Sequence, residues 1–143
     1  MAARLQVAFD CADTRRQAAF WAEALGYKLE DPPAGFDTWD AWADAQGIPE
    51  EHRDSVSAIV DPDGIGPRLY FQKVPEGKTA KNRVHLDVHT VDRDAPLEER
   101  RAAAQAEAER LVALGATRLE AHEEFGVYWI VLQDPEGNEF CVH

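Results

Sequence analysis

The chain has 143 residues, of which 45% are hydrophobic, and it carries a formal net charge of −12. This length suits one domain, or two fused half-domains that are too small to be stable apart. The acidity argues against nucleic acid or an anionic membrane as a partner, because both attract clustered cationic charge. No apolar run approaches the roughly 18 residues of a membrane span, and we find no signal peptide, so we expect a cytoplasmic protein. Cys11 and Cys141 lack CxxC spacing, which favours reduced thiols over a disulfide framework.

The first half of the chain is predicted to form a strand, a helix and three further strands. Residues 4–10 alternate apolar and polar side chains, as a strand with one buried face does. Asp13 is expected to cap a helix that Gly26 ends, because glycine readily adopts the left-handed conformation. The further strands are predicted over residues 27–30, 57–60 and 67–74.

An insertion over residues 31–55 interrupts this half. Trp39 and Trp42 are three residues apart, which predicts a short helix whose aromatic side chains cover another part of the protein. They cover either the core or the mouth of a cleft. The core is the favoured interpretation, because buried tryptophan is common.

The second half repeats the same order after a linker at about 75–82, so the chain is predicted to be one domain of two modules, about 1–76 and 83–143. Residues 83–90 again alternate, and Asp94 precedes a long helix. Its first turn carries Glu98 and Glu99, where the helix dipole favours acids. The last strands are expected over residues 117–121, 127–132 and 139–143.

The two halves match in detail. Gln6 lies seven residues before Asp13, and His85 lies seven residues before Asp92, with each aspartate predicted at a helix start. Both helices end in Leu-Gly, and both halves close on a turn and a strand, DPDGIGPRLYFQKV and DPEGNEFCVH. A duplicated unit of this kind can pair its two sheets around one cleft, so we expect the functional site between the copies.

If the apolar face of each sheet packs on its helix, the opposite faces line that cleft. These faces collect donor side chains from the first and last strands, namely Gln6, Asp10, His85, Asp87, His89, Glu139, Cys141 and His143. Tyr70 and Gln72 share one face of strand 67–74, but the pattern does not fix which face points inward. Clustered donors in a concavity predict a metal or small-ligand site.

The stretches VAFDCADTRRQAAFWAEALGY, NRVHLDV and DPEGNEFCV resemble the vicinal oxygen chelate superfamily, in the glyoxalase-like branch that also includes dioxygenases and bleomycin-resistance proteins. With the duplication, the resemblance covers essentially the whole chain. It implies an α+β fold in which tandem βαβββ modules form a cupped, partly open mixed β-barrel with helices on the outer face. Superfamily members are often dimers, so we expect a homodimer.

In metal-using members, one ligand comes from the first strand and one from the last strand of each module, and the substrate chelates the metal through adjacent oxygens. Carried over, the first-strand positions fall on Gln6 and His85. The last-strand position, usually glutamate in the second module, falls on Cys141, and its first-module counterpart is Tyr70, Phe71 or Gln72. Without a secure carboxylate this set suits zinc or iron poorly as a hard, open catalytic site, although a thiolate binds zinc tightly. The site is therefore expected either to hold a divalent metal (zinc, iron, manganese or nickel) or to be metal-free.

Three functions remain open. The first is a metal-dependent lyase, isomerase or dioxygenase in which Asp87 or Glu139 moves the proton. The second is a binding protein that sequesters an aromatic molecule or antibiotic, and its ligand-binding candidates are Trp39, Trp42, Tyr70, Phe71 and Gln72. The third is a metal-independent enzyme that uses His85 and Asp87 directly. The missing carboxylate ligand favours a small-molecule protein with a degenerate metal site.

Structural roles compete with these functions. His85 can be a histidine that Asp87 satisfies from two residues away, and Asp87 can instead pair with Arg83 or Lys81. Cys141 can be a small buried hydrophobe.

Overall fold

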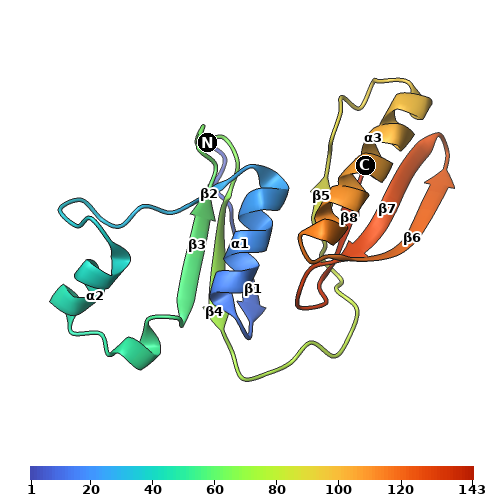
Figure 1. Ribbon diagram of the computed structural model, residues 1–143. Helices are drawn as coiled ribbons and strands as arrows, with labels where there is room; N and C mark the ends of the chain where they lie inside the picture. The colour runs from blue at the N-terminus through green and yellow to red at the C-terminus, as the bar shows by residue number, and fades with distance from the viewer. The chain divides into compact units, whose positions relative to one another are not determined.

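The computed structural model describes residues 1–143, which divide into two compact units, Met1–Gly77 and Lys78–His143. We call these units module 1 and module 2 (Figure 1). Module 1 consists of β1 (Gln6–Cys11), α1 (Thr14–Leu25), β2 (Lys28–Leu29), α2 (Trp39–Gln46), a 3-10 turn η1 (Glu50–His52), β3 (Val56–Val60) and β4 (Arg68–Lys73). Module 2 consists of β5 (Asp87–Val88), α3 (Leu97–Ala113), β6 (Thr117–Glu124), β7 (Val127–Gln133) and β8 (Glu139–Val142).

Both modules have the same topology. Their four-stranded sheets run in the orders β1-β4-β3-β2 and β5-β8-β7-β6. In each sheet the first and last strands of the module pair in parallel, and the other pairs are antiparallel. The predicted α+β class and its tandem βαβββ order are therefore confirmed, with the insertion adding α2 and η1 to module 1. That the modules enclose one cleft stays a prediction.

The core of module 1 lies between its sheet and α1. The Asp13 carboxylate accepts a hydrogen bond from the Arg16 amide at 3.0 Å, and Gly26 ends the helix with φ 68°, so both predicted helix limits are confirmed. Trp21 is 1% exposed, and its ring centroid lies 5.4 Å from that of Phe9 on β1. Helix and sheet thus bury one aromatic layer, which leaves the polar side chains of β1 on the opposite face.

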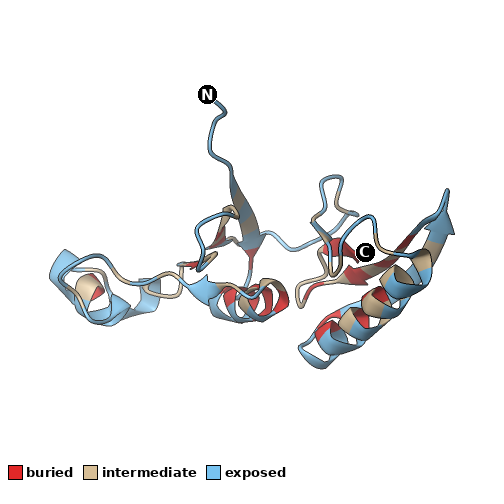
Figure 2. Ribbon diagram, turned by 90° about the horizontal axis from the view of Figure 1, so that it is seen from above, coloured by how far each residue is buried: buried red, intermediate tan, exposed pale blue.

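The core of module 2 lies between its sheet and α3. Ala104, Ala108 and Leu111 on the helix and Ile130 and Leu132 on β7 are fully buried (Figure 2). The two alanines carry little side-chain bulk, so the helix can approach the strands closely.

The start of α3 differs from the prediction that placed Asp92 at a helix start. The helix begins at Leu97, directly after Pro96, and no side chain caps it. The Asp92 carboxylate instead accepts from the Asp94 amide at 2.9 Å within a turn. The proline explains the delay, because it disfavours helical backbone in the residue before it.

Strand lengths in module 2 also differ from the prediction. Regular pairing in β5 is confined to Asp87–Val88, although backbone hydrogen bonds to β8 continue on both sides, from the Cys141 amide to Leu86 O and from the Thr90 amide to His143 O. β6 is longer than predicted, because it forms a hairpin with β7 through Phe125 and Gly126, which have φ of 51° and 72°. Two positive φ values in a two-residue turn match the twist of a hairpin.

The insertion does not bury its tryptophans in the core, which corrects the favoured interpretation. Trp39 is 43% exposed, and Ala43 is the buried residue of α2. Most of this helix is exposed (Figure 2). The Trp39 and Trp42 rings pack edge to face at 5.5 Å, and the Trp39 indole donates to Glu30 O at 2.8 Å. The two tryptophans therefore contact each other, and Trp39 also contacts the chain just after β2.

Two further findings concern the helices and the cysteines. None of the helices combines the length and apolar character that a membrane crossing requires. Cys11 and Cys141 are buried and form no disulfide.

Replacing Gly66 with alanine is expected to destabilise module 1 by about 1–3 kcal/mol, because overpacking a filled site forces its neighbours apart. A Cβ atom at this position would overlap the Tyr27 hydroxyl, and the Gly66 amide is held by Asp61 at 2.7 Å. Urea unfolding measures the change. Gly77→Ala is the matched control, because no heavy atom lies within 4 Å of its Cβ position and its φ is not left-handed. Equal stability of the two variants would contradict the expected overlap.

Candidate functional site

Three donor side chains of module 2 meet on the face of the sheet opposite α3. The parallel pairing of β5 and β8 places Asp87 directly opposite Cys141. His85 precedes Asp87 by two residues, and its Nδ1 lies 3.0 Å from Asp87 Oδ1. One ligand atom each from His85, Asp87 and Cys141 lies within 4.8 Å of the other two. We call this set the donor cluster.

The chemistry of the donor cluster fits a divalent metal. An imidazole nitrogen, a carboxylate oxygen and a thiolate sulfur are all zinc ligands, and three protein ligands leave a fourth position open, as in catalytic zinc sites. Burial, and secondarily the charge of Asp87, raises the pKa of the Cys141 thiol. Metal binding would therefore have to displace a proton from this thiol. Asp87 supplies the carboxylate that the sequence prediction found missing, in addition to its predicted role as a proton carrier.

Beside the donor cluster, four rings from neighbouring strands form a row across the same face. The centroid distances are 4.9 Å between His89 and His143, 6.3 Å between His143 and Trp129, and 5.2 Å between Trp129 and His122. Interplanar angles of 22° to 28° make all three contacts stacked. His143 Nε2 lies 3.8 Å from Asp87 Oδ2, which connects the row to the donor cluster. We call these four residues the ring row.

Sequence reasoning placed His89 and His143 on this face but missed Trp129 and His122. A signal for Trp129 was present in the sequence. Buried and partly exposed side chains alternate along β7, so Trp129 lies opposite the face that buries Ile130 and Leu132.

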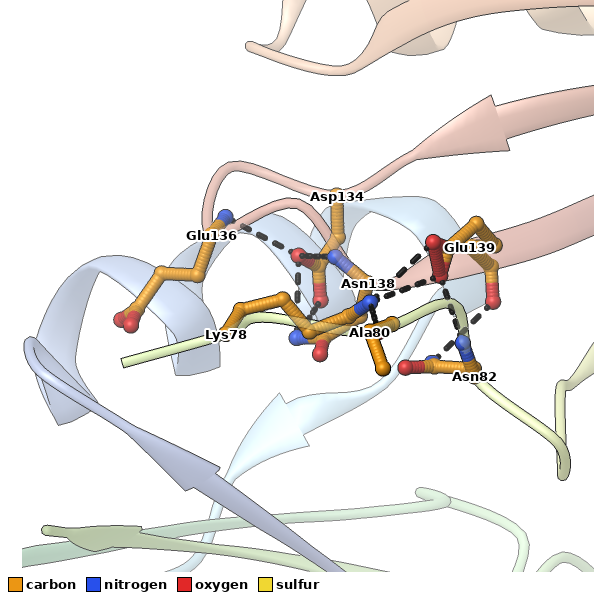
Figure 3. Close-up of polar contacts among 7 residues, drawn as sticks. All are labelled: Lys78, Ala80, Asn82, Asp134, Glu136, Asn138 and Glu139. Carbon is orange, nitrogen blue, oxygen red and sulfur yellow. Dashed lines mark hydrogen bonds and ion pairs between the residues drawn. The ribbon is translucent and has the colours of Figure 1, made fainter. Parts of the chain in front are cut away.

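Glu139 on β8 does not belong to the donor cluster, because its carboxylate is engaged elsewhere. It is 9% exposed, and its carboxylate is held by Lys78 and by the backbone amide of Asn82 (Figure 3). Burial acts to raise the pKa of Glu139, but the hydrogen bond from Asn82 and the contact with Lys78 outweigh it and hold this pKa below its ordinary value. A carboxylate engaged in this way is poorly suited to moving protons, which leaves Asp87 as the better placed of the two predicted proton carriers.

In module 1 the corresponding face carries a different set of contacts. The register of β1 and β4 pairs Ala8 with Tyr70 and Asp10 with Gln72, so Tyr70 and Gln72 lie on the face of Gln6 and Asp10. This settles which side chains of β4 share the polar face. The Gln72 amide donates to Asp10 Oδ1 at 2.7 Å.

The predicted metal ligand of module 1 already has a cationic partner. Gln6 Oε1 accepts from Arg68 Nη1 at 2.9 Å, and the same guanidinium donates to both carboxylate oxygens of Glu30, at 3.0 and 2.6 Å. If Gln6 corresponds to His85, Ala8 and Tyr70 stand where module 2 has Asp87 and Cys141. Module 1 therefore has no equivalent of the donor cluster.

Phe71 does not belong to the polar face, which corrects its place among the predicted ligand-binding residues. Its side chain is fully buried on the α1 side of the sheet, with its ring 5.2 Å from Phe9. Alternation along β4 makes this necessary once Tyr70 and Gln72 point the other way. Phe71 is therefore a packing residue of the core.

Comparison with known proteins identifies the family. A family model described as a glyoxalase-like domain matches residues 6–143. The chain belongs to this family. No curated protein matches the sequence.

Solved structures of the glyoxalase/bleomycin resistance/dioxygenase superfamily share the fold of this glyoxalase-like protein. FosX, a fosfomycin resistance protein from Listeria monocytogenes solved with Mn(II) and 1S,2S-dihydroxypropylphosphonic acid, has a TM-score of 0.63 at 12% identity and covers 100% of this chain and 90% of its own. A family enzyme from Burkholderia phytofirmans has a TM-score of 0.62 at 18% identity, with 96% and 94% covered. A bleomycin-binding protein from Streptomyces verticillus, solved with copper(II)-bleomycin, has a TM-score of 0.54 at 12% identity, with 99% and 95% covered. At these identities the likeness establishes the fold alone.

Proposed function

We propose that this glyoxalase-like protein binds a small aromatic or oxygen-bearing molecule on the open face of the module 2 sheet. The ring row carries this proposal, because a row of imidazole and indole rings beside a cluster of polar donors offers an aromatic surface and hydrogen-bonding groups together. The fold is shared with proteins solved with copper(II)-bleomycin and with a phosphonate, which supports a small-molecule role. The predicted homodimer remains part of this proposal.

The residues on this face of the module 2 sheet have different roles in the proposal. Trp129 and His143 form the middle of the ring row and contact a planar part of the ligand through their ring edges. Asp87 accepts from His85 Nδ1, which fixes the orientation and tautomer of the imidazole and leaves Nε2 as an acceptor for a ligand hydroxyl. Asp87 can in turn stabilise the imidazolium that forms when a proton moves to His85.

Replacing Trp129 with alanine is expected to weaken binding of catechol, an aromatic probe with two adjacent oxygens, by about tenfold. An aromatic contact, edge-to-face ones included, contributes about 0.5–1.5 kcal/mol beyond the area it buries, and the lost area adds to that. Isothermal titration calorimetry measures the affinity. Phe125→Ala removes a 95% exposed ring at the tip of the β6–β7 hairpin and serves as the matched control. Loss of binding in Trp39→Ala rather than in Trp129→Ala would place the aromatic ligand at the insertion and contradict the proposal.

A second candidate function is a metal-dependent lyase, isomerase or dioxygenase, and the donor cluster is the observation that favours it. His85, Asp87 and Cys141 would hold the ion, which would act as a Lewis acid on a ligand oxygen. Elemental analysis of protein purified without chelator and without a histidine tag tests this function. Close to one zinc, iron, manganese or nickel per chain supports it. A value far below one after reconstitution favours the metal-free binding protein.

A further inference from the structure

The segment that leads into β5 is fastened to one residue of β8. We call residues 78–84 the strap. Lys78 Nζ lies 3.1 Å from each carboxylate oxygen of Glu139 and also contacts Ala80 O, and the Asn82 amide donates to Glu139 Oε2 at 3.0 Å (Figure 3). The Asn82 side chain reaches back to Glu139 O at 3.5 Å. Glu139 is thus the point on β8 to which the strap is attached, through Lys78 and Asn82.

Burying the carboxylate of this attachment costs free energy, which argues that the attachment has a function. The Glu139 side chain is 10% exposed, and a carboxylate removed from water is tolerated only when charges and hydrogen bonds compensate it. Here an ammonium group and a backbone amide do so. A solvated polar residue would avoid that cost if this position needed only to continue the strand.

The turn that precedes Glu139 is ordered by hydrogen bonds of its own. The Asp134 carboxylate accepts from the amides of Glu136 and Asn138, at 2.9 and 3.0 Å, and from the Asn138 side chain (Figure 3). These contacts order the turn between β7 and β8 and fix where β8 begins. The strap is therefore fastened directly after a hydrogen-bonded turn of module 2.

The strap needs such an anchor because β5 has few contacts of its own. Its regular pairing covers two residues, and the first backbone hydrogen bond to β8 is the one that the Cys141 amide donates to Leu86 O. His85 lies just before that bond, and the parallel register continued by two residues places it opposite Glu139. The position of His85 thus depends on a short strand at one end and on the Glu139 attachment at the other.

We propose that Glu139 is a positioning residue: by clamping the strap it sets His85 and Asp87 opposite Cys141. The clamp rests on the proposed function only in that these three residues form the binding site. Glu139 acts through the backbone of residues 82–86 and need not touch the ligand.

The test compares Glu139→Gln with Glu124→Gln, which makes the same change at an exposed strand end, by amide hydrogen exchange in the metal-free protein. The amides of Cys141 and His143 donate to Leu86 O and Val88 O, so their protection reports how firmly β5 is docked. Glu139→Gln is expected to lower it by about tenfold or more relative to the amides of the β6–β7 hairpin. Glu124→Gln is expected to leave this ratio unchanged. A general loss of stability would lower the exchange protection of the β8 amides and of the hairpin amides together, and that result would overturn the clamp.

A Zn(II) titration of the same proteins tests the consequence for the site. Loss of an outer contact that orients metal ligands typically weakens metal binding 10–100-fold, so Glu139→Gln is expected to raise the Zn(II) Kd by about tenfold. Unchanged Zn(II) affinity alongside lost protection would overturn the positioning role. If the native protein binds no Zn(II), the metal-dependent function fails, and amide exchange alone decides whether the clamp exists. Lys78→Gln weakens the clamp from the partly exposed side and replaces Glu139→Gln should that variant not fold.

Discussion

His85→Ala is expected to weaken Zn(II) binding at least about a hundredfold and to leave the fold intact. His85 supplies one of three donor atoms that lie within 4.8 Å of one another, and two remaining ligands cannot complete the usual set of a zinc site. The imidazole is exposed, and its hydrogen bond is to Asp87, so its removal opens no cavity in the core. Calorimetric titration with Zn(II) and elemental analysis of the purified variant measure the loss.

His52→Ala is the matched control, because His52 is an exposed histidine in η1 of module 1. It should bind Zn(II) as the unmodified protein does. If His85→Ala also retains native affinity, His85 is only the structural partner of Asp87. Cys141→Ser separates the two cases further, because a serine hydroxyl is a far weaker zinc ligand than a thiolate and should lower affinity only if the donor cluster is the site.

The local features of the fold could be predicted because local chemistry decides them. Asp13 caps α1 through its own carboxylate, and Gly26 ends the helix in the left-handed conformation, and neither depends on distant residues. The predicted start of α3 was wrong for an equally local reason. Asp92 resembles Asp13 in the alignment of the halves, but it closes a turn before Pro96. The duplication predicted the topology and could not predict a shift within one copy.

The candidate site was only partly predictable, because alternation assigns faces and does not assign neighbours. His85 and Asp87 are two residues apart and had to share a face. That Cys141 lies directly opposite Asp87 depends on the register of two strands that are 54 residues apart in the sequence. The same limit hid the Arg68 guanidinium, which reaches Gln6 across 62 residues.

The two modules have diverged on the same scaffold. In module 1, Ala8 and Tyr70 offer no close pair of metal ligands, and the oxygen of Gln6 is occupied by an arginine that also neutralises Glu30. In module 2, the corresponding pair is Asp87 and Cys141, and no arginine is paired with His85 or Asp87. The internal guanidinium satisfies in module 1 the acceptors that a bound cation could satisfy, whereas module 2 presents three donor atoms that no guanidinium occupies.

Lys78→Met is expected to destabilise the protein by about 2 kcal/mol, because it leaves the Glu139 carboxylate in a poorly hydrated position without its counter-charge. Removing one partner of a fully buried ion pair costs about 3–5 kcal/mol, and the partial exposure of Lys78 reduces this figure. Urea unfolding measures the change. Lys28→Met is the matched control, since its ion pair with Asp31 is largely exposed and such pairs contribute about 0–1 kcal/mol.

A double-mutant cycle separates this ion pair from general effects of the substitution. Once Glu139→Gln has removed the buried charge, Lys78→Met should cost about 1 kcal/mol less than it does in the native protein, because no unpaired carboxylate remains. Strictly additive effects would mean that the ammonium and the carboxylate do not stabilise each other, and the strap would then be held by the Asn82 amide alone. A coupling of the expected size would instead establish that the ion pair contributes to holding the strap on β8.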